Sequence, residues 1–198
     1  AHHSAMKHVA PVRAALGIRT IFNMLGPLAN PAGAKRQVLG VFAPEWVEPF
    51  ARALLALGSE RAFVVHGLDG VDEISTCGAT LVAEVKDGAV RTFELAPEDL
   101  GVSRVRLEAL RGGTATENAE ALKRVLNGEP GPFYDLVTVN AAAALVVAGI
   151  APDLKAGVER ARAAIAGGNA MAALEALKGS LVLLSHAKSA ESRELAKA

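Results

Sequence analysis

The stretch "RQVLGVFAPEWVEPFARALLALGSERAFVVHG", residues 36–67, contains the alternation that decides the fold class. Its first part, residues 36–43, is short, apolar and rich in strand-forming residues, which predicts a buried strand. Residues 44–58 have a proline near their start and a glycine at their end, and this punctuation is typical of a helix. Residues 61–67 form a second short apolar run. A strand, a helix and a strand in this order predict a parallel pair joined by a right-handed crossover.

The segments that follow extend this pattern. The run "ATLVAEVKDGAVRTFEL" predicts a β-hairpin that turns at Asp87 and Gly88. Residues 114–128 predict a helix with Thr116 as its N-cap. Residues 133–149 begin with β-branched residues, but their length and alanine run favour a helix, and two further helices are expected after them. We therefore expect an α/β fold, with a mostly parallel sheet flanked by helices.

Composition excludes several classes of protein. The 198 residues carry 21 basic and 21 acidic side chains, and this balance argues against a protein that binds nucleic acid through net charge. Cys77 is the single cysteine, so we expect no disulfide framework, no thiolate metal site and a cytoplasmic location. The most apolar run, residues 136–151, is shorter than the ~20 residues that span a bilayer, and Asn140 interrupts it. No membrane partner is expected.

A loop rich in carboxylates follows the second predicted strand. It reads "HGLDGVDEISTCG", residues 66–78, and it contains Asp69, Asp72 and Glu73 among three glycines. Ligands of open α/β sheets bind beyond the carboxyl ends of the strands. Mg²⁺ is held by one or two carboxylates together with water and substrate phosphates. The loop is therefore a candidate metal site, although the same residue types are also common in solvated turns.

A second unusual segment is "RTIFNMLGPLANPAG", residues 19–33. Its apolar helical start is broken at Gly26 and Pro27, and again at residues 30–31. Two breaks this close together indicate a backbone shaped around a ligand or a hinge between two bodies. Arg13 lies upstream, in a cluster of basic residues, and its guanidinium could bind a carboxylate or a phosphate in a bidentate manner.

The exact residue order of three segments indicates a protein family, which their composition alone does not. Residues 2–32 ("HHSAMKHVAPVRAALGIRTIFNMLGPLANPA"), residues 66–75 ("HGLDGVDEIS") and residues 112–149 together resemble the anthranilate phosphoribosyltransferases. The resemblance extends to about Leu177. It implies two parts: residues 1–34 as the remnant of a small all-helical domain with its hinge, and residues 35–198 as the C-terminal part of the α/β phosphoribosyltransferase domain.

The resemblance also implies an activity and its residues. In this family a phosphoribosyl group passes from phosphoribosyl pyrophosphate to the amine of anthranilate, pyrophosphate leaves, and the product enters tryptophan biosynthesis. By the family's pattern, Arg13 binds the anthranilate carboxylate, Gly26 and Pro27 shape the aromatic pocket, and His3 lines it; the metal-binding pair consists of Asp72 and Glu73, which hold Mg²⁺. No side chain is assigned a catalytic role. A cytoplasmic homodimer is implied for the complete enzyme.

The sequence departs from the family in one respect. The glycine-rich phosphate loop of the family, and the helices around it, do not occur in these residues. The expectation is that the chain is the C-terminal portion of such an enzyme and is inactive by itself. Two alternatives stay open: a pyrimidine-nucleoside phosphorylase-like enzyme of the same fold, against which the acidic pair argues, and a non-catalytic structural fragment.

Overall fold

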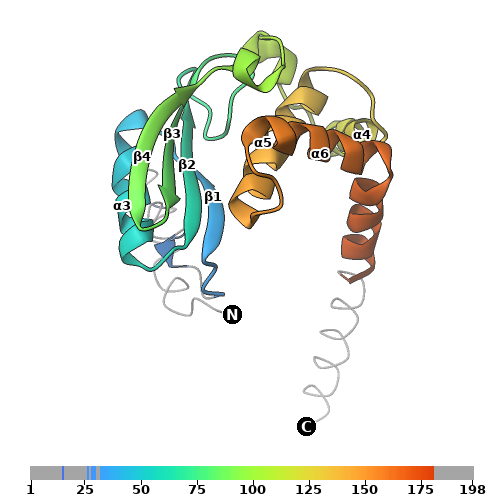
Figure 1. The fold of residues 1–198 in the computed structure, drawn as a ribbon. Helices are drawn as coiled ribbons and strands as arrows, with labels where there is room; N and C mark the ends of the chain where they lie inside the picture. The colour runs from blue at the N-terminus through green and yellow to red at the C-terminus, as the bar shows by residue number, and fades with distance from the viewer. Residues whose placement is uncertain (1–14, 16–25, 27, 30–31, 181–198) are drawn as a thin grey trace.

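The computed structural model describes residues 15, 26, 28–29 and 32–180, which form a four-stranded sheet with helices on both faces (Figure 1). The strands follow one another across the sheet in chain order: β1 (Arg36–Gly40), β2 (Arg61–Gly67), β3 (Thr80–Lys86) and β4 (Ala89–Leu95). β1 and β2 pair in parallel, whereas β2, β3 and β4 pair in antiparallel fashion.

The predicted strand–helix–strand unit is confirmed. A short 3-10 turn, Pro44–Trp46, leads into α3 (Val47–Ala56), which connects the two parallel strands. The predicted hairpin is also present, and its turn residues Asp87 and Gly88 have φ angles of 51° and 76°. Two consecutive positive φ angles are what a two-residue hairpin turn between twisted strands requires.

The α/β class and the flanking helices are confirmed, but the described sheet is mixed rather than mostly parallel. The reason is the hairpin. A two-residue turn can join only antiparallel strands, so β3 and β4 are antiparallel, and the hairpin joins the sheet through β3, which pairs antiparallel with β2. One parallel pairing therefore stands next to two antiparallel pairings within the described residues.

β2 is the central strand of two hydrophobic cores. Ala62 and Val64 face α3, where they pack in one cluster with Phe50 and Leu54. Phe63 and Val65 alternate with them and belong to the second cluster, on the opposite face. Six of the seven residues of β2 are buried, as expected for a strand that is covered on both faces.

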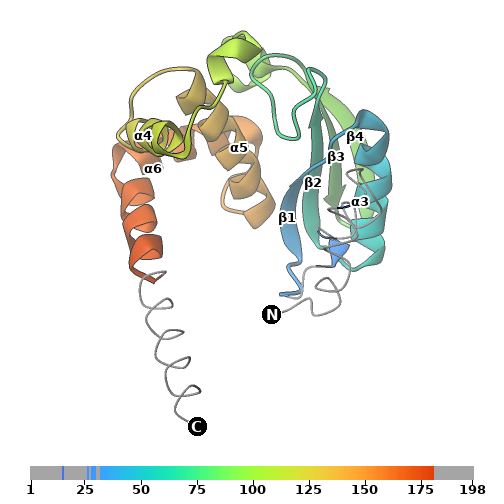
Figure 2. The same cartoon turned by 180° about the vertical axis from the view of Figure 1, so that it is seen from behind.

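The second face of the sheet is covered from the helical half of the chain. This half contains the 3-10 turns Pro97–Leu100 and Leu107–Leu110, then α4 (Ala115–Leu126), α5 (Pro132–Ala148), α6 (Leu154–Ala166) and a further helical stretch, 169–180. In views from both sides, α5 is the helix of this half that lies beside β1 (Figure 2). Its buried residues join the second cluster: Val139, Ala142, Ala143, Val146 and Val147.

Two local predictions in this half have different outcomes. Residues 133–149 are helical as predicted. The predicted N-cap of α4 at Thr116 is wrong, because Thr114 caps the helix two residues earlier. Its hydroxyl accepts a hydrogen bond from the amide of Glu117 at 3.3 Å, and the Glu117 carboxylate accepts one from the amide of Thr114 at 2.7 Å. This reciprocal capping box satisfies two amides that the helix itself leaves unpaired.

An arginine fixes α5 to the start of the sheet. Arg36, the first residue of β1, donates a hydrogen bond of 2.8 Å from Nη1 to the carbonyl of Ala148, the last residue of α5. Its Nε lies 3.2 Å from a carboxylate oxygen of Glu60. A cation at the C-terminal end of a helix is stabilised by the helix dipole.

The predicted helical part at residues 1–34 lies almost wholly outside the described residues, so the division at residue 34 stays a prediction.

Candidate functional site

The candidate site is the loop of residues 68–79, called the acidic loop below, which connects β2 to β3. It begins at the carboxyl end of β2. The parallel strand β1 ends at the same edge, where the amide of Val41 donates a hydrogen bond of 3.0 Å to the carbonyl of Val65. The buried ring of His66 lies 2.8 Å from the carbonyl of Val41 through Nδ1. The loop therefore starts from a fixed point at the edge where α/β sheets bind ligands.

Ser75 organises the interior of the acidic loop. Its hydroxyl donates a hydrogen bond to a carboxylate oxygen of Asp69 and accepts one from the amide of Cys77 at 2.8 Å. Its own amide donates to the hydroxyl of Thr80 at 2.9 Å. Within the described part of the chain, the other carboxylate oxygen of Asp69 is buried and has no hydrogen-bond partner. Asp69 therefore contributes mainly to the shape of the loop.

Two glycines let the acidic loop lie directly on the sheet. A Cβ atom at Gly40, the last residue of β1, would lie 1.6 Å from the carbonyl oxygen of Asp72. A Cβ atom at Gly67 would lie 2.6 Å from both Asp69 and Val71. At Gly67 the close atoms belong to side chains of the loop, whereas at Gly40 they belong to the backbone, and only glycine fits where one backbone approaches another so closely. The glycine at the end of β1 therefore determines where Asp72 lies.

Asp72 and Glu73 are adjacent, and their environments differ. Asp72 is exposed, whereas Glu73 is half-buried. Burial raises the pKa of the Glu73 carboxyl, and the negative charges of Asp72 and Asp69 raise it further. Among the described residues, neither Asp72 nor Glu73 pairs with a lysine or arginine. Three carboxylates on one short loop without a basic partner leave a concentration of negative charge that a cation would neutralise.

This donor set fits Mg²⁺ better than a metal that is held by protein ligands alone. The described residues contain no group of three or more His, Cys, Asp or Glu side chains arranged to hold a metal ion. Mg²⁺ needs only one or two carboxylates, because water and substrate phosphates complete its octahedron. Asp72 and Glu73 satisfy this requirement, since the third carboxylate of the loop already accepts a hydrogen bond from Ser75.

Only some of the predicted site residues lie among the described residues. It places Asp72 and Glu73 side by side in the acidic loop. Of the residues predicted to bind anthranilate, Gly26 is described: it is exposed, and its carbonyl accepts a hydrogen bond of 3.3 Å from the amide of Ala29. The other three predicted binding residues lie outside the described residues: His3, Arg13 and Pro27. Their roles stay predictions.

Sequence reasoning missed the role of Asn140. Its side chain, on α5, exchanges two hydrogen bonds with the backbone of Ile74, the residue that follows Glu73. The signal was present in the sequence as the single amide that interrupts the most apolar run. A polar side chain inside an apolar helix needs a partner, but the sequence does not show which one it finds.

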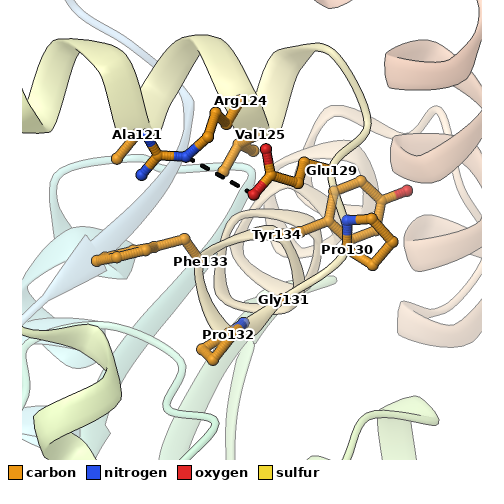
Figure 3. A pocket seen from close by; sticks show the side chains of 9 residues that line it. All are labelled: Ala121, Arg124, Val125, Glu129, Pro130, Gly131, Pro132, Phe133 and Tyr134. Carbon is orange, nitrogen blue, oxygen red and sulfur yellow. Dashed lines mark ion pairs between the residues drawn. The ribbon is translucent and has the colours of Figure 1, made fainter.

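Other hollows lie away from these carboxylates. One, of about 130 Å³, lies between α4 and the start of α5, and Arg124 and Glu129 face each other across it at 3.7 Å (Figure 3). A larger apolar groove of about 400 Å³ is lined mainly by apolar residues of α5 and α6. No residue of the acidic loop lines either hollow. No helix among the described residues is long and apolar enough to cross a bilayer.

Comparisons with known proteins agree with the sequence motifs. The family model described as "Glycosyl transferase family, a/b domain" matches residues 1–171. The anthranilate phosphoribosyltransferase of Parvibaculum lavamentivorans is 58% identical over 177 residues, which cover 89% of this chain and 52% of that protein. The chain thus spans about half the length of the curated relatives that it matches.

Two solved structures share the fold. The crystal structure of anthranilate phosphoribosyltransferase from Thermus thermophilus has a TM-score of 0.80 and 51% identity, over 87% of this chain and 51% of that one. The enzyme of the same name from Saccharomyces cerevisiae, in complex with PRPP and Mg, has a TM-score of 0.79 and 34% identity, over 87% of this chain and 50% of that one.

Proposed function

Because the chain belongs to the glycosyl transferase family through its a/b domain, we propose that it acts in the transfer of a phosphoribosyl group from phosphoribosyl pyrophosphate to the amine of anthranilate. Pyrophosphate is released, and the reaction serves tryptophan biosynthesis. The observation that carries the proposal is the Asp72–Glu73 pair at the carboxyl end of β2. It is supported by relatives that bear the name of this activity and by a structural neighbour in complex with PRPP and Mg.

In this proposal Asp72 and Glu73 bind Mg²⁺ at the edge of the sheet. The ion, when bound, stabilises the negative charge on the departing pyrophosphate. Gly40 fixes the backbone of Asp72 by allowing the loop to lie directly on β1. Glu73 is half-buried beside two other carboxylates, and this environment raises the free energy of its ionised form. A cation bound at the pair would lower that free energy again.

The acceptor is positioned by residues from the N-terminal segment. We assign the anthranilate carboxylate to Arg13, whose guanidinium can donate two parallel hydrogen bonds to it. Gly26, Pro27 and His3 are assigned to the walls of the aromatic pocket. Holding the amine close to C1 of the ribose converts an encounter of two molecules into a reaction within one complex, and this supplies a large part of the rate enhancement. The support for these four residues is the resemblance of residues 2–32 to the family.

The proposal extends to the location and the assembly of the protein. The single cysteine supports a cytoplasmic location. The homodimer and the division into residues 1–34 and 35–198 are supported by the resemblance to the family.

The test uses the protein expressed from its complete gene. Anthranilate consumption and pyrophosphate release are measured together, with phosphoribosyl pyrophosphate and Mg²⁺ supplied. We expect one pyrophosphate for each anthranilate consumed, and no reaction when EDTA is present. Phosphate-dependent cleavage of a pyrimidine nucleoside without anthranilate consumption would instead assign the chain to the phosphorylase alternative.

A further inference from the structure

Asn140 is a polar side chain on the apolar helix α5, next to the buried Val139. Its Oδ1 accepts a hydrogen bond of 2.9 Å from the amide of Ile74, and its Nδ2 donates one of 2.9 Å to the carbonyl of Ile74. Nδ2 also donates to the carbonyl of Leu136, one turn earlier in α5, at 3.0 Å. The amide is thus held by its own helix while it bonds both backbone groups of one loop residue.

The side chain of Asn140 bonds the backbone of Ile74 in the way that a neighbouring strand would. Ile74 lies between β2 and β3, so no strand of the described sheet pairs with its backbone. Its side chain is 1% exposed and belongs to the same hydrophobic cluster as Val139. A backbone amide and carbonyl buried at this point would each lose free energy without a partner. Asn140 supplies both partners, and Ile74 is fixed through its backbone and its side chain together.

The position of Ile74 matters because of its neighbours. Glu73 precedes it directly, and Asp72 lies against Gly40 of β1. The two carboxylates therefore lie between two fixed points, a glycine of the sheet on one side and an asparagine of the helical layer on the other. A bidentate amide restrains rotation of the backbone as well as its distance from α5, because two bonds of defined direction must be kept together.

We propose that Asn140 is a positioning residue, which holds the Asp72–Glu73 pair at the place where Mg²⁺ and pyrophosphate bind. This inference rests on the proposed function of the pair. Asn140 makes no contact with substrate in this proposal; it acts through the backbone of Ile74. Its loss is expected to weaken metal–pyrophosphate binding while the affinity for the aromatic amine is unchanged.

Three variants separate positioning from general stability. Asn140→Leu keeps a similar volume on an apolar helix and removes all three hydrogen bonds. Asn140→Asp keeps the shape and the bond from the amide of Ile74 but loses both donors. Thr138→Val is the matched control: Thr138 also lies on α5 and is fully buried, but its hydroxyl donates only to the carbonyl of Asp135 at 3.0 Å.

The protein expressed from its complete gene is measured in three ways. Amide hydrogen exchange at residues 72–75 is expected to become at least tenfold faster in Asn140→Leu and to stay at the wild-type rate in Thr138→Val. Calorimetric binding of Mg²⁺ with inorganic pyrophosphate is expected to weaken at least fivefold. In turnover, the Mg²⁺ concentration for half-maximal rate is expected to rise several-fold with an unchanged KM for anthranilate. Asn140→Asp is expected to show changes of the same sign, because it loses both donated bonds and places a carboxylate oxygen against the carbonyls of Ile74 and Leu136; it decides the question if Asn140→Leu does not fold.

The outcomes separate this inference from the proposed function. A folded Asn140→Leu protein with wild-type exchange at residues 72–75 and a wild-type Mg²⁺ curve overturns the positioning role, while transferase activity in the same protein leaves the function standing. Conversely, a wild type that binds Mg²⁺ and pyrophosphate more tightly than Asn140→Leu does, but that consumes no anthranilate, supports the positioning role and rejects the proposed function.

Discussion

Replacing Gly40 by alanine should displace the candidate metal pair with little direct effect on other parts of the fold. The added Cβ atom would start 1.6 Å from the carbonyl oxygen of Asp72, whereas real Cβ atoms essentially never approach closer than 3.0 Å. The two atoms must therefore separate by about 1.4 Å. The nearby atoms belong to the backbone and Cβ of Asp72, so no flexible side chain can move out of the way. The acidic loop must shift as a unit.

A shift of this size has two calculable consequences. A displacement of about 1 Å at a reacting centre costs roughly a hundredfold in rate, equivalent to about 2.7 kcal/mol of barrier. Overpacking at a tight contact costs about 1–3 kcal/mol of stability, which lowers the Tm of a protein of this size by about 2–12 °C. We therefore expect Gly40→Ala to fold and to lose about 99% of its turnover, with the loss concentrated in the response to Mg²⁺.

The assay compares turnover at saturating substrates, the Mg²⁺ titration and thermal unfolding for Gly40→Ala and Gly179→Ala. Gly179 is the matched control, because it lies in the helical stretch 169–180 with nothing within 4 Å of an added Cβ. Its substitution should leave activity unchanged and add up to about 1 kcal/mol of stability. Wild-type turnover and Tm in Gly40→Ala would show that the acidic loop does not lie on β1 in this way.

The remaining predictions concern other parts of the molecule. The double substitution Asp72→Asn with Glu73→Gln should leave the fold intact, as judged by circular dichroism, but lower kcat more than tenfold, or more than about 1.4 kcal/mol of barrier; an unchanged Mg²⁺ curve in the folded variant would reduce the pair to ordinary loop acids. Arg13→Ala should raise the KM for anthranilate, since a charge-assisted hydrogen bond contributes roughly 1.5–3 kcal/mol; an equal rise for phosphoribosyl pyrophosphate would indicate a structural role. Thr114→Ala should cost about 1 kcal/mol in denaturant unfolding through loss of the N-cap of α4; a wild-type midpoint would contradict this. Hydrogen bonds from the amide and hydroxyl of Thr114 lower the pKa of Glu117, so the stabilisation should be full above the ordinary pKa of 4.5 and be lost as pH falls through the lower folded value; a Glu117→Gln protein with the wild-type acid unfolding curve would argue against it.

Local signals in the sequence predicted much of the fold correctly. The turn at Asp87 and Gly88 and the helix at residues 133–149 were predictable, because a positive φ and an alanine-rich run are properties of the segments themselves. The N-cap of α4 was predicted at the wrong one of two threonines, which lie two residues apart. Thr114 is the cap because a capping box needs the acid three residues after the cap, and Glu117 lies at that position.

The parts that could not be predicted depend on contacts between distant segments. The mixed character of the sheet follows from the pairing of β2 with β3, and residue patterns alone do not specify which strand becomes the neighbour of another. The acidic pair was assigned from its motif, and its metal-binding role stays a prediction. The close contact of Gly40 with Asp72 and the bonds from Asn140 to Ile74 were not predictable, because they join residues 32 positions or more apart in the chain.

The burial of β2 on both faces has a consequence for how the chain folds during synthesis. α3 covers one face and is made before β2, but α5, which covers Phe63 and Val65, is made about 70–80 residues later. At about 5–20 residues per second, a ribosome takes roughly 4–16 s to complete that interval. For this time one apolar face of a formed strand has no partner. Contacts as distant as that between Arg36 and Ala148, 112 positions apart, also close slowly. The new chain therefore offers a chaperone its clearest apolar target at Phe63 and Val65, and it does so before α5 has been made.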